Sequence, residues 1–356
     1  MAYLPLSTAN LPDPAINPAQ GSSPADYFGA VLYTGNNATQ SIDVGFATDF
    51  TWIKVRNVAD NHFLYDNVRG ATKYLSSDTT SAEGTIANGL TSFTSTGFNL
   101  GDSGSTNNAS NNFAAWNWKA NGSGVSNTDG SITSTVSANT ESGFSIVSYT
   151  GNGTAGATVG HGLSSVPDMV IAKDRDDPFT GNAWPVYHTA NGATKVLYLE
   201  KTNSVGTSSV IWNNTEPTTS VFSLGSWNGI NKSGDNYIAY CFHSVEGFSK
   251  FGSYTGNGST DGPFVYTGFR PAFVMTKATN STQSWVMVDN ERAGYNVENY
   301  RLFAESSNAE STTTPIVDLL SNGFKWRNNF GNFNGSGTNY IYMAFAENPF
   351  KYSNAR

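Results

Sequence analysis

The amino-acid sequence predicts an all-β protein: three tandem modules of β-sandwich or jelly-roll type, preceded by an extended N-terminal arm. Aromatic residues and charged residues each make up 13% of the 356-residue chain, which is a high share for aromatic residues and a low share for charged ones. The aromatic residues stand between runs of Gly, Ser, Thr and Asn, which is typical of short strands joined by tight turns. A set of short sequence landmarks also recurs three times in the same order, which indicates an internal duplication.

Each copy begins with Tyr-Thr-Gly-Asn, a sequence that predicts a strand ending in a turn where Gly and Asn tolerate positive φ. An apolar strand that ends in lysine follows, and a strand of small and aromatic residues closes the copy with large residues at alternate positions, as expected when one face meets a core. The first landmark begins at Tyr33, Tyr149 and Tyr254, the second ends at Lys54, Lys173 and Lys277, and the closing strands are residues 113–118, 237–242 and 340–345. The modules therefore span residues 28–120, 143–247 and 248–350.

The segments between the modules differ in length. Residues 121–142 consist mostly of Gly, Ser, Thr, Asn and Val, and predict a semi-structured linker in which residues 131–136 could form a strand. The second and third modules follow each other with almost no gap, so we expect them to form a stiff pair. Residues 351–356 form a short C-terminal tail.

Residues 1–27 belong to no repeat and contain Pro5, Pro12, Pro14, Pro18 and Pro24. Proline at this density is incompatible with a helix and favours an extended arm. One interpretation is a floppy leader. The other, which we prefer, is an arm that anchors the protein to another subunit by burying Tyr3, Leu4, Leu6, Leu11 and Ile16.

Net charge excludes several classes of partner. The chain carries a formal net charge of −8 and has no cluster of Lys and Arg, so we expect no nucleic-acid binding. No apolar stretch approaches the length of a membrane-spanning helix, and the N-terminus lacks the features of a secretory signal. We therefore expect synthesis in the cytoplasm and no insertion into a membrane.

Few residues stand in patterns that carry chemistry. The histidines His62, His161, His188 and His243 lack zinc-ligand spacing, and no nucleophile elbow, P-loop or dinucleotide fingerprint is present. The single Cys241 cannot form an intrachain disulfide and is interpreted as a buried thiol. The sequence therefore predicts no catalytic residue, no metal and no cofactor.

Two acidic patterns leave alternatives open. The cluster at residues 174–177 reads Asp-Arg-Asp-Asp, which suits a solvated loop better than a calcium site. Asp66 with Arg69 recurs as Asp289 with Arg292, which predicts a local ion pair that pins a loop. The alternative for these aspartates is catalysis, which requires a second carboxylate at a defined separation.

Three tryptophans beside polar turn residues are candidates for recognition of a receptor or glycan: Trp212, Trp227 and Trp326. An aromatic ring surrounded by Asn and Asp can stack on a sugar ring while its neighbours bond the hydroxyls. The competing interpretation is that these rings cover module edges or a contact between subunits.

The sequences of residues 254–258 (Tyr-Thr-Gly-Asn-Gly), 262–275 and 344–350 (Ala-Phe-Ala-Glu-Asn-Pro-Phe) resemble a module of virion proteins from marine tailed phages. Such modules are usually described as tail-fibre-like or as a domain of unknown function. The resemblance covers residues 28–350, supplies no catalytic residues, and implies a place on the virus particle, with assembly in the host cytoplasm.

We therefore expect a non-enzymatic structural protein of the virion, most simply a fibre or spike subunit that contacts the host surface. The alternatives are a capsid decoration protein (a head fibre), a polysaccharide-degrading spike and a free carbohydrate-binding module. The expected partners are tail or capsid proteins through the arm, further copies of the chain with a trimer favoured, and a host surface glycan.

Overall fold

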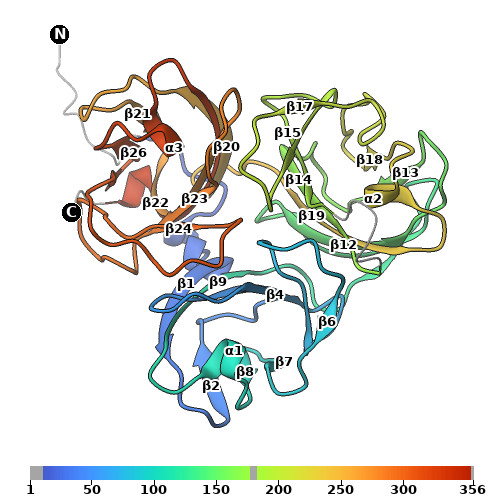
Figure 1. Ribbon diagram of the computed structural model, residues 1–356, viewed down its shortest axis with the longest axis horizontal. Helices are drawn as coiled ribbons and strands as arrows, with labels where there is room; N and C mark the ends of the chain where they lie inside the picture. Colours follow the sequence, from blue (N-terminus) through green and yellow to red (C-terminus); the bar gives the residue numbers. More distant parts are fainter. Residues whose placement is uncertain (1–10, 177–182, 354–356) are drawn as a thin grey trace.

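The computed structural model describes residues 11–176 and 183–353, and its antiparallel sheets confirm the all-β class. Figure 1 shows three lobes arranged around a common centre, one for each segment predicted from the repeats. We call the lobes modules one, two and three, in chain order.

Each module contains a large antiparallel sheet with the same strand order: β1-β9-β3-β4 in module one, β12-β19-β14-β15-β16 in module two and β20-β27-β22-β23-β24 in module three. The strands of module one are β1 (Phe28–Thr34), β9 (Asn112–Trp118), β3 (Phe50–Val55) and β4 (His62–Asp66). Those of module two are β12 (Phe144–Thr150), β19 (Asn236–Phe242), β14 (Met169–Asp174), β15 (Pro185–His188) and β16 (Lys195–Tyr198). Those of module three are β20 (Ser249–Thr255), β27 (Asn339–Pro349), β22 (Phe269–Ala278), β23 (Val286–Asp289) and β24 (Leu302–Phe303).

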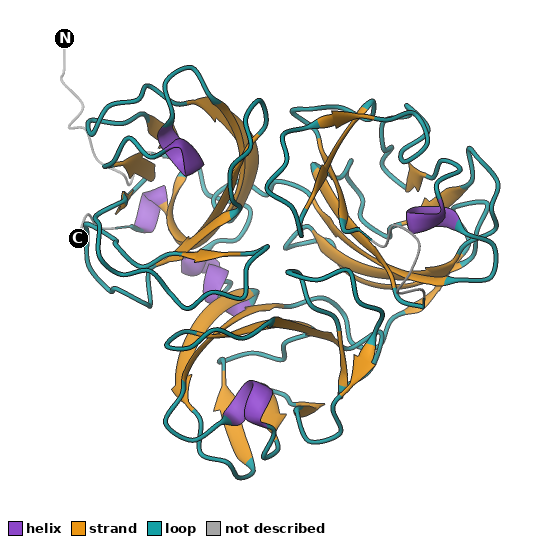
Figure 2. Ribbon diagram, in the orientation of Figure 1, coloured by secondary structure: helices purple, strands orange, loops and turns teal. Residues whose placement is uncertain are grey.

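A smaller sheet and a short helix cover one face of each large sheet (Figure 2). The small sheets are formed by β2 (Gln40–Asp43), β8 (Gly97–Leu100) and β7 (Leu90–Phe93); by β13 (Thr158–Gly160) and β18 (Val221–Ser223); and by β21 (Phe264–Tyr266), β26 (Gly323–Trp326) and β25 (Val317–Leu320). The helices are α1 (Gly104–Asn107), α2 (Asn228–Asn231) and α3 (Gly331–Asn334), and short pairings involve β5 (Lys73–Tyr74), β6 (Gly84–Thr85) and β17 (Gly206–Thr207).

Residues 121–142, expected to be a semi-structured linker with a possible strand, form part of a sheet. This segment contains β10 (Val125–Asn127) and β11 (Ser134–Asn139), and β11 pairs with β12 along its whole length. The Thr, Ser and Val residues of the segment favour a strand, and the open edge of β12 supplies the backbone partners. The segment therefore extends the large sheet of module two.

The three large sheets share one central hydrophobic core. The closing strands β9, β19 and β27 bury both faces, not one as expected: alternate residues such as Trp118, Phe242 and Phe345 meet at the centre, while the others face the module's own core. The ring centroids of Trp118 and Phe345 lie 5.6 Å apart, and those of Phe242 and Phe345 lie 6.0 Å apart. A void among these side chains measures only about 10 Å³, at the lower limit for a single water molecule. The modules thus form one packed unit.

The described part of the arm folds back onto its own chain. It contains the short 3₁₀ turns η2 (Pro18–Gln20) and η3 (Pro24–Asp26), each with proline in its first turn, and Ile16 is buried in the central core. The expectation that Ile16 is buried on another subunit is therefore wrong, because the central core of its own chain already covers it. Tyr3, Leu4 and Leu6 lie outside the described residues.

The Tyr-Thr-Gly-Asn turns are held by the short helices. Each turn tyrosine donates to a helix carbonyl, as Tyr149 does to Ile230 at 2.9 Å, and each helix ends in a buried asparagine that accepts from the turn, as Asn231 does from Asn152 at 2.9 Å. The same bonds occur from Tyr33 and Tyr254 and to Asn107 and Asn334.

The turn glycines Gly35, Gly151 and Gly256 are required by a close approach to the backbone. A Cβ on Gly151 would lie 2.3 Å from the carbonyl oxygen of Lys232. The positive φ predicted for Gly and Asn in this turn occurs two residues later, at Asn37, Gly153 and Gly258.

Candidate functional site

The interfaces between modules repeat in a cycle, with each module donating hydrogen bonds to the preceding one. The lysine that ends each apolar strand is buried, and its Nζ reaches a carbonyl oxygen of another module. These bonds join Lys54 to Ser307, Lys173 to Thr80 and Lys277 to Thr202 at 3.2, 3.3 and 3.1 Å. Burial lowers the pKa of Lys54 and of Lys277 to about 8.

A second ring of bonds involves aromatic donors. The indole N–H of Trp184 donates to Ser76 of module one, and that of Trp285 donates to Tyr198 of module two, both at 3.0 Å. In module one His62 takes this place: its Nδ1 accepts from the Trp52 indole at 2.8 Å, so Nε2 carries the proton and faces the carbonyl of Phe303 at 3.0 Å. Burial keeps this imidazole neutral and lowers its pKa to about 3.

Two of the three interfaces contain a buried network of carboxylates and arginines. In both, the predicted local ion pair is present: Arg69 binds Asp66 at 2.5 Å, and Arg292 binds Asp289 at 2.6 Å. The same arginines reach a glutamate, Glu83 or Glu310, which in turn binds an arginine of the neighbouring module. These neighbours are Arg175, at 2.8 Å from Glu83, and Arg56, at 2.9 Å from Glu310.

The central strands of the neighbouring modules complete the networks. The Tyr240 hydroxyl donates to Asp66 at 2.8 Å, and the Trp116 indole donates to Asp289 at 2.9 Å. Burial alone would lower the pKa of Arg69 and Arg292, but the neighbouring carboxylates raise it above its usual value. Both guanidiniums therefore remain charged. Each of the two buried aspartates therefore has both an opposite charge and a neutral donor, which compensate for the burial of charge.

The interface between modules two and three lacks this network. The residues equivalent to Asp66, Arg69, Glu83 and Arg175 are here His188, Asn191, Val205 and Thr279. In place of Tyr240 or Trp116, the closing strand β27 has Met343. The backbone geometry is kept: Val205 N donates to Thr279 O at 2.8 Å, as Glu83 N does to Arg175 O. A methionine side chain has no hydrogen to donate. An aspartate at the position of His188 would therefore lack the neutral donor that Asp66 and Asp289 have.

These contacts bear on the acidic patterns seen in the sequence. Asp66 and Asp289 are occupied by arginines, which gives no support to their use in catalysis. Asp174 is buried and Arg175 is engaged at the interface, so the solvated-loop interpretation of residues 174–177 is wrong for these two, and Asp177 lies outside the described residues. In the described ranges no group of three or more metal-ligating side chains comes together.

The candidate recognition tryptophans are mostly buried. Trp212 and Trp326 are 2% and 0% exposed and belong to the cores of modules two and three, so their predicted receptor contact is wrong. Burial of these large aromatic rings stabilises the fold more than their exposure beside polar turns would. Trp227 is half-buried against the core of module two, next to Tyr198.

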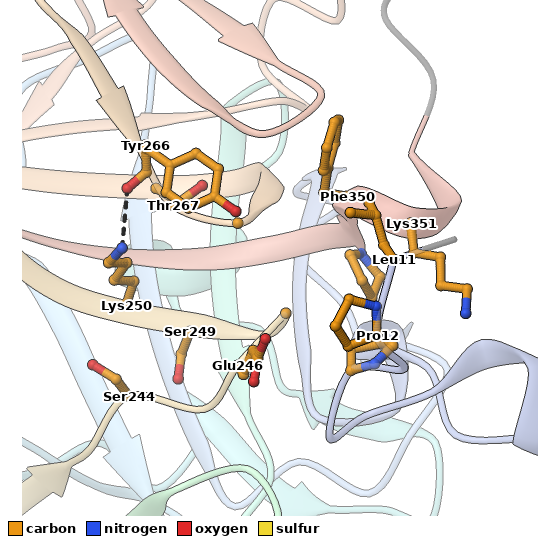
Figure 3. Close-up of a pocket in the computed structure, with 14 residues that line it drawn as sticks. Leu11, Pro12, Ser244, Glu246, Ser249, Lys250, Tyr266, Thr267, Phe350 and Lys351 are labelled. Atoms are coloured by element: carbon orange, nitrogen blue, oxygen red, sulfur yellow. Dashed lines mark hydrogen bonds between the residues drawn. The ribbon is translucent and has the colours of Figure 1, made fainter. Parts of the chain in front are cut away.

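The arm and module three enclose a groove of about 480 Å³, which we call the anchoring groove (Figure 3). Leu11 and Pro12 form one side, and Lys250 and Tyr266 form the other. The Lys250 ammonium donates to the Tyr266 carbonyl at 3.2 Å and lies 5.1 Å from the centre of its ring, which is 54% exposed.

The arm is fastened at this groove by the C-terminal segment. Lys351 binds Asp13 at 2.6 Å, and the Tyr352 hydroxyl donates to Asn17 at 2.8 Å. Gly247 leaves room for Pro14, since a Cβ there would lie 2.6 Å from the proline ring. The groove therefore lies where the described part of the arm begins.

Comparison with known proteins places the whole repeat in one family. The profile of a domain of unknown function, DUF7483, matches residues 23–349. The chain belongs to the DUF7483 family. No curated protein and no solved structure matches it.

The DUF7483 match spans all three modules as one unit, in agreement with their shared core. Sequence reasoning missed the role of Glu83 and Glu310 in this unit. A signal was present: Ala-Glu recurs at residues 82–83 and 309–310, after the recurring Asp and Arg. The anchoring groove had no comparable signal, because its sides come from segments far apart in the chain.

No helix in the described ranges is both long and apolar enough to cross a bilayer.

Proposed function

We propose that this DUF7483 protein is a non-enzymatic structural protein of a tailed-phage particle, a fibre or spike subunit anchored by its N-terminal arm. The observation that carries the proposal is the use of the buried charges. Arg69, Arg292 and their carboxylates all serve to hold modules together. This use suits a rigid building block that must survive outside a cell.

The arm supports an anchoring role. It is fastened by Lys351 and Tyr352 and reaches the anchoring groove at Leu11. A segment of a partner protein that binds in this groove beside Leu11 would meet the exposed Tyr266 ring and the Lys250 ammonium. The resemblance to tail-fibre-like virion proteins, which covers the same three modules, favours a partner on the particle.

A capsid decoration protein is the second candidate. Figure 2 shows three lobes around one centre, a broad block and not a narrow shaft. Such a block suits a position flat on a shell, with the arm directed into it. Cryo-electron microscopy of the phage particle separates the candidates: density for the chain on the tail supports the fibre, density on the head supports decoration, and a particle without the chain rejects both.

The oligomeric state belongs to the same proposal. A trimer was expected because three chains could pack their aromatic-rich faces together. Those faces meet within one chain, so they are no argument for a trimer. Light scattering on the purified protein measures the state directly, and a variant lacking residues 1–10 tests whether any self-association depends on the arm.

A further inference from the structure

The interface between modules two and three contains a hollow where the other two interfaces have charged side chains. Between modules one and two, the Arg175 guanidinium fills this space, binding Glu83 at 2.8 Å and the Ser148 hydroxyl at 3.3 Å. The equivalent residues here are Thr279, Val205 and Ser253, all shorter or uncharged. The result is a hollow of about 390 Å³, which we call the interface hollow.

The walls of the interface hollow are polar but carry no charge. They include the amides of Asn191 and Asn339 and the hydroxyls of Ser253, Thr255 and Thr279. Among the described residues, neither the Asn191 amide nor the Ser253 hydroxyl has a side-chain hydrogen-bond partner. Donors and acceptors are therefore available to a ligand.

We infer that the interface hollow is a binding site for a neutral saccharide unit of a surface glycan. Its volume lies within the range of about 300–1,000 Å³ that is usual for ligand sites. Amide and hydroxyl groups both donate and accept, as sugar hydroxyls do. A charged ligand would lose its hydration without gaining an opposite charge.

The position of the hollow agrees with the proposed function, on which this inference rests. Strand β20 runs from Ser249, at the anchoring groove, to Thr255, at the interface hollow. Six residue steps along a strand cover about 20 Å. A protein held at the groove therefore keeps the hollow at a distance from its attachment point.

The chain itself supplies the variant that tests the inference. Val205→Glu combined with Thr279→Arg restores the pair that fills the space in the other two interfaces, and keeps the backbone bond between these residues. Saturation-transfer NMR of the full chain against glucose, galactose, mannose and N-acetylglucosamine measures binding, with glucosamine and galacturonate as charged controls. We expect at least one neutral sugar to bind with a Kd on the order of 1 mM.

The double variant should weaken that binding at least tenfold, whereas Tyr266→Ala in the anchoring groove should leave it unchanged. Near-UV circular dichroism checks folding, and Asn191→Ala, with an expected loss of at least threefold, serves if the double variant does not fold. The inference is overturned if no neutral sugar binds, if the charged sugars bind as well, or if the variants with an altered hollow bind like the wild type.

The two proposals fail separately. A particle that carries the protein, together with a purified chain that binds no sugar, rejects the saccharide site alone. A chain that binds sugar but is missing from the particle rejects the virion role and leaves the site in place.

Discussion

The indole of Trp116 in module one donates its N–H to a carboxylate oxygen of Asp289 in module three, at 2.9 Å. The guanidinium of Arg292, which binds the same aspartate, lies 5.6 Å from the centre of the indole ring. A charge pair from one module is thus enclosed by an aromatic residue of another, and it is fully buried only when the modules are assembled.

Loss of Asp289 should therefore destabilise the whole protein. Asp289→Ala leaves Arg292 buried with only one of its two carboxylate partners, Glu310, and we expect the free energy of unfolding to fall by about 3–5 kcal/mol. His188→Ala, at the equivalent place in the interface without a network, should cost less, about 1–2 kcal/mol, since it removes a neutral side chain with bonds of 3.4 and 3.1 Å and leaves no arginine unpaired. Urea unfolding measures both, and equal losses would contradict the role assigned to the network.

His62 should make the protein sensitive to acid. Its pKa is about 3 in the folded chain because of burial, against about 6.5 when unfolded. The unfolded chain binds the additional proton between these values, so the free energy of unfolding falls as the pH is lowered from about 6.5 toward 3. Between pH 6.5 and 5, wild type should lose about 1–2 kcal/mol more than His62→Gln. A parallel decline of the two proteins would show that another group is responsible.

Glu298 should make the stability depend on pH in the opposite sense to His62. It is 1% exposed, both of its carboxylate oxygens lack a hydrogen-bond partner in the described structure, and burial raises its pKa to about 8. The folded chain holds the proton between about 4.3 and 8, so stability falls as the pH rises through this window and then levels off. Glu298→Gln should remove this slope and raise the free energy of unfolding at pH 7 by about 1–3 kcal/mol. Unfolding is measured at several pH values for wild type and variant. If the two proteins show the same dependence on pH, the Glu298 carboxyl is not its cause.

Two glycines of module two, Gly151 in the Tyr-Thr-Gly-Asn turn and Gly206 in β17, offer a matched pair of substitutions. Gly151→Ala places a methyl group 2.3 Å from a backbone oxygen and should cost about 1–3 kcal/mol. Gly206→Ala meets its nearest neighbour at 3.7 Å, at a residue without positive φ, and should change stability by less than about 1 kcal/mol. Thermal unfolding of the two variants compares the effects, and a Gly151 variant as stable as wild type would argue against the close approach.

Separate modules should not fold. Module three alone, residues 248–350, would expose Phe273, Met275, Met343 and Phe345, which belong to the central core. An apolar area of this size cannot face water in a stable monomer. We expect dispersed NMR signals from the full chain and collapsed or aggregated material from the isolated module. A well-dispersed spectrum of the isolated module would mean that the shared core is dispensable.

Sequence reasoning was accurate where the cause is local. The β class follows from alternation and turn residues, and the pairs Asp66–Arg69 and Asp289–Arg292 follow from a spacing of three residues. It was wrong where an apolar residue had several possible neighbours. Trp212 and Trp326 stand beside polar residues in the chain, but in space they pack on core strands.

The sequence by itself determined the three copies, their turns and their paired charges, because these depend on residues close together along the chain. Only the tertiary structure decided that the copies share one core, that the arm returns to its own chain at Ile16, and that one interface of three lacks the network of carboxylates and arginines. A strand with two apolar faces must bury both, and which surface covers the second face depends on segments far away in the chain.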